Sequence, residues 1–105
     1  MIYVFWTCAN PEEAKKIARG LLERRWFACA SILPAVESVY RWEGNVEESK
    51  EAKVILKTKR ELFADIRDYI LKHGSYQVPE ISAVKVEIAN PSYLKWLEEE
   101  VGLPG

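Results

Sequence analysis

Few residues of this sequence are able to do chemistry. There are two cysteines, Cys8 and Cys29, and one histidine, His73. Thiolate and imidazole are ligands that suit copper or zinc, so these side chains are candidates for a metal site. One cysteine and one histidine are too few for a closed zinc site within a single chain. Glutamate carboxylates, or ligands shared across a subunit interface, would have to complete such a site.

Each of these side chains also has a purely structural interpretation. Cys29 lies between Ala28 and Ala30, a setting typical of a small and buried hydrophobic cysteine. His73 lies at the end of a predicted helix, where a positive charge interacts favourably with the helix dipole. A cysteine paired with a histidine would supply a nucleophile, but no local motif supports such a pair.

Familiar catalytic and phosphate-binding motifs do not occur in the chain. GxGxxG, GxxxxGK[S/T], HExxH and CxxC are all absent from the sequence. The acidic runs at residues 47–48 and 98–100 place carboxylates side by side, which is typical of solvated faces. We therefore expect a protein that is not an enzyme and that requires no cofactor, with a divalent metal ion such as copper as the one candidate ligand of this kind.

Length and composition restrict the class of protein. The 105 residues suit a single domain, residues 1–105, and 49% of them are hydrophobic. The formal net charge of -1 excludes the strongly basic surface of a nucleic-acid clamp. No apolar stretch approaches the roughly 20 residues of a membrane span, and the N-terminal apolar run lacks the charged start of a signal peptide. We expect a cytoplasmic protein that binds neither nucleic acid nor membrane.

The polar residues indicate a thermostable protein. Glutamate provides 14 of the 16 acidic residues, and lysine plus arginine number 15. The chain has one methionine and one glutamine. Abundant glutamate and lysine with few thermolabile residues is a pattern of thermophile proteins.

Three segments have the pattern of helices. The first starts at Asn10-Pro11, an N-cap followed by a proline, and its apolar spacing extends to about Trp26. The second covers residues 62–73, and Gly74 is its natural end. A short third helix is predicted from Pro91.

Four further segments are predicted strands, at residues 2–8, 28–43, 46–58 and 80–88. Pro34 inside the second strand indicates a bulge or an edge position. Glu43-Gly44-Asn45 is a predicted hairpin turn. Because side chains alternate along a strand, one face of the hairpin carries Val36, Ser38, Tyr40 and Trp42.

The order βαββαβ followed by a helix predicts an α+β fold. Right-handed crossovers make it a ferredoxin-like plait with both long helices on one face of a four-stranded antiparallel sheet. A long central hairpin and a C-terminal helix are added to this plait. The opposite face then carries half of the first strand's side chains and the hairpin aromatics. Since an uncovered apolar face marks an interaction site, we expect the chain to self-associate through it.

Five stretches, spread over nearly the whole chain, share one family's pattern. They are residues 27–34 (FACASILP), 38–44 (SVYRWEG), 55–58 (ILKT), 76–81 (YQVPEI) and 93–97 (YLKWL). In this order they resemble the CutA divalent-cation-tolerance family. The resemblance implies a homotrimer of ferredoxin-like plaits that is linked to tolerance of divalent metals, notably copper, and for which no catalytic reaction is established.

The resemblance also selects the candidate metal ligands. Cys29 matches a family position, whereas Cys8 has no clear counterpart, so Cys29 and His73 are the candidate pair. The family usually has His-Pro-Tyr where this chain reads His73-Gly74-Ser75-Tyr76. The histidine is therefore one residue further from the tyrosine than in the family pattern, and the proline is absent.

A cleft between subunits is the second candidate site, lined by Tyr40, Trp42, Tyr76 and Glu80. Interface packing is one interpretation, because tryptophan and tyrosine bury much area while keeping a polar group. A small-ligand site is the other, by analogy with the trimeric P-II signalling proteins that the family resembles. Two functions follow: a trimer that acts in tolerance to divalent metals, or a signalling trimer that binds a small ligand or a protein partner between its subunits.

Overall fold

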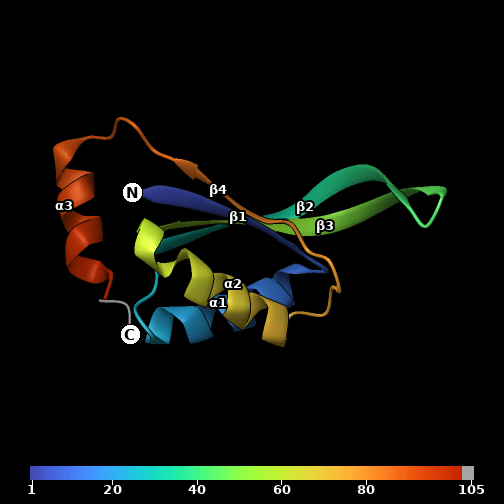
Figure 1. The fold of residues 1–105 in the computed structure, drawn as a ribbon, viewed down its shortest axis with the longest axis horizontal. Coiled ribbons are helices and arrows are strands. Elements are labelled where there is room, and N and C mark those ends of the chain that lie inside the picture. The colour runs from blue at the N-terminus through green and yellow to red at the C-terminus, as the bar shows by residue number, and fades with distance from the viewer. Residues whose placement is uncertain (103–105) are drawn as a thin grey trace.

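The computed structural model describes residues 1–102 and has an α+β architecture. Figure 1 shows one sheet with two helices packed beneath it and a hairpin that projects to one side. The strands and helices, in chain order, are β1 (Ile2–Cys8), α1 (Pro11–Glu23), β2 (Cys29–Trp42), β3 (Asn45–Thr58), a 3-10 helix η1 (Arg60–Leu62), α2 (Phe63–His73), β4 (Ile81–Lys85) and α3 (Pro91–Glu100).

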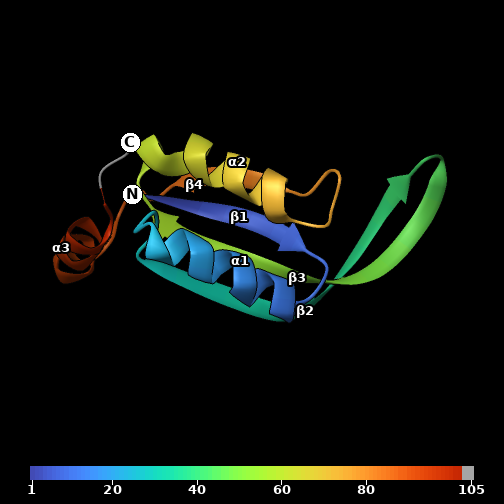
Figure 2. The same ribbon diagram turned by 90° about the horizontal axis from the view of Figure 1, so that it is seen from below.

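The four strands form one sheet in the order β2-β3-β1-β4. Every neighbouring pair is antiparallel. Helices α1 and α2 cover the same face, as Figure 2 shows from the helix side. The predicted ferredoxin-like plait is therefore confirmed. Helix α3 lies at the end of the molecule opposite to the hairpin tip (Figure 1).

The first helix begins where the sequence predicts and ends earlier. The side-chain oxygen of Asn10 accepts a hydrogen bond from the backbone N–H of Glu13 at 2.8 Å, and Pro11 occupies the first turn. The helix ends at Glu23 and not at Trp26, because Arg25 has a left-handed φ of 59°. The Arg25 guanidinium then donates to the backbone carbonyls of Glu99 and Glu100, which fixes the end of α3 beside this turn.

Strand β1 separates the two sides of the sheet. Ile2, Val4, Trp6 and Cys8 are buried beneath the helices, whereas Tyr3, Phe5 and Thr7 alternate with them and are half-buried on the open face. Strand β3 has the same alternation, with Ala52, Val54, Leu56 and Thr58 fully buried. Within one chain, β1 is therefore fully buried on the helix side alone.

Strands β2 and β3 form the long hairpin, and each has 14 residues. Their register shifts between Leu33 and Val36, so the predicted bulge at Pro34 is present, and β2 is also an edge strand. The turn is tighter than predicted, since Asn45 pairs with Trp42 inside the strands. Glu43 and Gly44 both have positive φ, as a two-residue turn of this hand requires.

Strand β4 is shorter than the predicted 80–88. It covers five residues, Ile81–Lys85, because its partner β1 begins at Ile2. One further hydrogen bond from the backbone N–H of Val86 to the carbonyl of Met1 ends the pairing. The 3-10 turn η1 before α2 is not signalled by the sequence pattern.

The face of the sheet opposite to the helices stays open in the single chain. Among the described residues, the large hydrophobic side chains exposed on this side and on the hairpin include Leu33, Val39, Tyr40, Trp42, Val46 and Val84. Ile88 and Trp96, from the segment after β4 and from α3, are exposed as well. The predicted uncovered apolar surface is therefore present.

We predict that the core beneath the sheet dominates stability. Leu56→Ala removes a fully buried side chain between β3 and the helices and should lower the free energy of unfolding by about 2–5 kcal/mol. Guanidinium unfolding followed by circular dichroism at fixed chain concentration measures this. Leu22→Ala, at a half-exposed position of α1, is the matched control and should cost less than about 1 kcal/mol. Equal losses in the two variants would contradict this location of the core.

Candidate functional site

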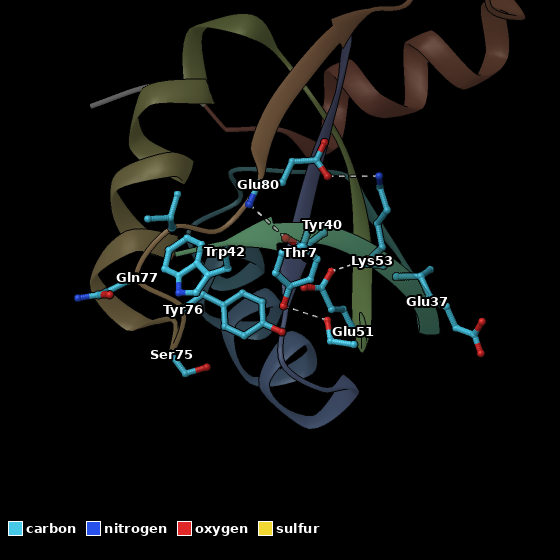
Figure 3. Close-up of a pocket in the computed structure, with 14 residues that line it drawn as sticks. Thr7, Glu37, Tyr40, Trp42, Glu51, Lys53, Ser75, Tyr76, Gln77 and Glu80 are labelled. Atoms are coloured by element: carbon cyan, nitrogen blue, oxygen red, sulfur yellow. Dashed lines mark hydrogen bonds and ion pairs between the residues drawn. The ribbon is translucent and has the colours of Figure 1, made fainter. Parts of the chain in front are cut away.

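A cleft of about 880 Å³ lies between the projecting half of the hairpin and the loop that joins α2 to β4. Figure 3 shows its side chains. The hairpin contributes Val36, Glu37, Ser38, Tyr40, Trp42, Ser49, Glu51 and Lys53. The loop contributes Ser75, Tyr76, Gln77, Val78 and Glu80, and Thr7 from the end of β1 completes the lining.

The bulge at Pro34 aims the hairpin aromatics into this cleft. Before the bulge, odd-numbered residues of β2 such as Leu33 lie on the open face together with Lys53 of β3. After the bulge, Val36 pairs with Glu51, so even-numbered residues of β2 lie on the open face. Two residues of β2 oppose one of β3, which is the definition of a bulge. Tyr40 and Trp42 are thereby turned to the cleft side.

Three hydrogen bonds hold the opposite wall of the cleft. The backbone N–H of Glu80 donates to Thr7 Oγ1 at 3.1 Å, and the N–H of Thr7 donates to the Glu80 carbonyl at 3.2 Å. The N–H of Ser75 donates to Glu13 Oε1 at 3.2 Å, which links the loop to α1. These bonds bring Tyr76 and Glu80 to face the hairpin.

All four residues predicted for the cleft, Tyr40, Trp42, Tyr76 and Glu80, line this one cavity. They come together within one chain, whereas the sequence led us to expect a cleft between subunits. Sequence reasoning missed Glu51. Alternation along β3 indicates the face on which Glu51 lies. That Glu51 shares this face with Tyr40 follows only when the position of the bulge is known to the exact residue.

The two carboxylates of the cleft, Glu80 and Glu51, have different partners. Lys53 Nζ lies 3.3 Å from Glu80 Oε1, and the Ser82 hydroxyl donates to Glu80 Oε2 at 2.9 Å. The Ser38 hydroxyl donates to Glu51 Oε2 at 2.8 Å. Burial, then the charge of Glu51 and a hydrogen bond to it, raise the pKa of Tyr76 to about 12. The Tyr76 phenol is therefore protonated at neutral pH.

The structure does not bring the two candidate metal ligands together. Cys29 is on the open face of the sheet, where its Sγ lies 3.9 Å from the Lys57 ammonium. His73 is in the helix layer on the other side, with its ring stacked on Tyr69 at 4.2 Å between ring centroids. Within residues 1–102, no group of three or more His, Cys, Asp or Glu side chains is arranged to hold a metal ion.

Cys8 is buried at the end of β1, on the helix side. Its Sγ lies 3.6 Å from the carbonyl oxygen of Asn10. Burial, followed by the negative charge of Glu13, raises the pKa of the thiol to about 11. A thiol that stays protonated at neutral pH is neither a nucleophile nor a thiolate ligand.

Across the described helices, none combines the length and apolar character needed to cross a bilayer.

A family model for the CutA1 divalent ion tolerance protein matches residues 2–100. The chain belongs to this family. The resemblance found in its sequence motifs is thus confirmed, and both walls of the cleft lie inside the matched region.

Several curated relatives are similar over most of this chain. The divalent-cation tolerance protein CutA of Pyrococcus horikoshii is 41% identical over 95% of this chain and 97% of its own length. That of Archaeoglobus fulgidus is 37% identical over 94% of this chain and 96% of its own length. The CutA homolog of Xenopus laevis is 38% identical over 90% of this chain. That protein is longer, and this chain spans 63% of its length.

Solved structures of the family have the same fold. CutA1 from Pyrococcus horikoshii superposes with a TM-score of 0.91 at 39% identity, covering 98% of this chain and all of that one. A protein from Archaeoglobus fulgidus, named a periplasmic divalent cation tolerance protein, has a TM-score of 0.92 at 36% identity over 97% of this chain and 100% of its own.

We predict that the Cys8 thiol titrates far above an ordinary cysteine. With a pKa of about 11 against 9.0 for an ordinary thiol, the folded state favours the neutral form. The contribution of this preference to the free energy of unfolding is complete below pH 9 and is lost as the pH rises through 11. In a Cys29→Ser variant labelled with ¹³C at the cysteine β-carbon, the NMR shift should have its midpoint near pH 11. The denatured chain, as control, should titrate near pH 9. A native midpoint near 9 would show that the thiol is solvated.

Proposed function

We propose that this chain acts in tolerance to divalent metal ions as a non-enzymatic homotrimer, with copper as the metal. Family membership over residues 2–100 carries the proposal, since the family and its archaeal members are named for divalent ion tolerance. The neutral Cys8 thiol supports a role without catalysis, and neither Cys8 nor His73 is among the described residues that line the cavity. We further propose that the protein is thermostable and acts in the cytoplasm.

The open face of the sheet supports the assembly part of this proposal. Phe5 and Val84 lie on that face without cover from the chain's own helices. Val39 and Val46, near the hairpin tip and on the other face of the hairpin, are 69% and 66% exposed. Apolar area of this kind is stabilised when a second surface covers it, and a hairpin that projects from the body is able to reach a neighbouring subunit (Figure 2).

Metal binding in this proposal is weak and shared between subunits. One chain has no cluster of three suitable ligands in its described part, so further ligands must come from a second chain. Cys29, on the open face, and His73, exposed at the end of α2, are the proposed soft ligands. The cleft with Tyr40, Trp42, Tyr76 and Glu80 is proposed as the place for a second ligand or a contact with a neighbour.

We predict a trimer in solution. Sedimentation equilibrium at micromolar concentration should give three times the chain mass of 12.1 kDa. Val84→Glu puts a charge on the open face and should shift the mass toward one chain, because burying an unpaired carboxylate is costly. Leu22→Glu, on the outside of α1, is the matched control and should remain a trimer. A monomeric wild-type protein would overturn the assembly proposal.

We predict that copper binds through a soft ligand. Titrations of copper(I), copper(II) and zinc are made on the wild type and on Cys29→Ser and His73→Ala, with calorimetry as the readout. Copper(I) binding should weaken in Cys29→Ser because thiolate is its preferred ligand. Cys8→Ser should bind as the wild type does, since that thiol is buried and neutral. Unchanged binding in both ligand variants would remove Cys29 and His73 from the proposed site.

A further inference from the structure

The Glu51 carboxylate lies at the centre of the cleft. Figure 3 shows it between Tyr40, Tyr76 and the strand that carries Lys53. Its Oε2 accepts a hydrogen bond from the Ser38 hydroxyl at 2.8 Å. Two ion pairs are formed within residues 1–102, Lys53 with Glu80 and Arg67 with Asp68. Glu51 takes part in neither, and the lysine that lines the cleft is paired with another carboxylate.

The groups that contact Glu51 are neutral donors. Ser38 donates a hydrogen bond to Glu51 through its hydroxyl, and the Tyr76 phenol lies near enough for the Glu51 carboxylate to raise its pKa. The pKa of Tyr76 is raised to about 12, so the phenol keeps its proton and remains a donor at neutral pH. These neutral groups leave the negative charge of Glu51 without a balancing positive charge.

Aromatic rings surround this charge. Tyr40, Trp42 and Tyr76 line the cavity together with Glu51, and Figure 3 shows their three rings. Trp42 and Tyr40 are 43% and 41% exposed, so their faces are open to a ligand. The face of an aromatic ring is negative and attracts a cation positioned over it. A carboxylate with rings around it is the arrangement that recognises organic cations.

Other classes of ligand fit this cavity less well. An anion would face Glu51 and Glu80, while the lysine of the cleft is already paired. A neutral apolar ligand would cover an ionised carboxylate without compensating it, which costs free energy. A bare divalent cation needs several oxygen or nitrogen ligands, whereas no group of three suitable side chains is present in the described chain.

We propose that the cleft binds a small organic cation that has a primary ammonium or guanidinium group on a short apolar stem. The cationic group contacts Glu51, and the stem lies along Trp42 and Tyr76. A cavity of about 880 Å³ accommodates a ligand of this size. The inference deepens the proposed ligand cleft and rests on it, but it requires neither bound metal nor a particular number of subunits.

Calorimetry on the full chain tests the cationic preference. The probes are n-butylammonium and N-butylguanidinium, and butyramide is the neutral compound of similar size. Both cations should bind about tenfold or more tightly than butyramide, as expected when a hydrogen bond to a charged group is gained. Equal binding of butyramide would overturn the proposal in favour of a simple apolar pocket. If neither cation binds, the proposal is overturned outright.

Variants locate the bound cation. Glu51→Gln keeps the size and one acceptor oxygen and should weaken n-butylammonium by about tenfold or more. Trp42→Leu should weaken it by about two- to fivefold through loss of the ring face. Glu48→Gln makes the same change of net charge at an exposed position whose partner in the hairpin is Val39, on the other face. It should have no effect.

The outcomes separate this inference from the proposed function. Equal loss of binding in Glu51→Gln and Glu48→Gln would show that general surface charge attracts the cation, and would overturn the cleft assignment. Circular dichroism confirms that each variant is folded, and Trp42→Leu tests the same cleft if Glu51→Gln does not fold. Sedimentation and copper titration of the wild type report on the trimer and on metal binding regardless of the amine result.

Discussion

The cleft depends on one extra residue in β2. Pro34 and Ala35 together oppose Ala52 of β3, so the alternation of side chains in β2 is reversed at that point. Without the bulge, Tyr40 and Trp42 would point to the side of the sheet that the helices occupy further along. With it, they share a face with Glu51 and Lys53. A bulge also increases local twist, and the outer half of the hairpin curves away from the plane of the sheet (Figure 1).

Proline suits this position for two physical reasons. It lacks a backbone N–H and therefore cannot complete a ladder of hydrogen bonds, which restricts it to edges and bulges. Strand β2 is at the edge of the sheet, and its pairing with β3 is already interrupted at Pro34. The same residue thus ends regular pairing in the body of the sheet and sets the direction of the projecting hairpin.

Most of the fold is predictable from local pattern, because period-two and helical spacing are both clear. The N-cap at Asn10 and the bulge at Pro34 are both confirmed by the structure. The end of α1 is missed because Arg25 adopts a left-handed conformation, which the sequence pattern does not signal and which is accompanied by hydrogen bonds to the end of α3. For the cleft, aromatic type and spacing single out Tyr40 and Trp42. Glu51 is not found, since its position depends on the exact register across the bulge.

The open face divides into two parts with different physical demands. In the body of the sheet it carries half-buried residues such as Phe5 and Ile55, which gain stability from any apolar cover. Beyond the bulge it carries the Glu51 carboxylate, whose burial under another protein surface would cost desolvation unless a cation came with it. The apolar part is therefore the better surface for self-association, and the acidic part is better suited to remain open. A chain of 105 residues can in this way use one face both to join its copies and to present a charged, aromatic-lined cleft.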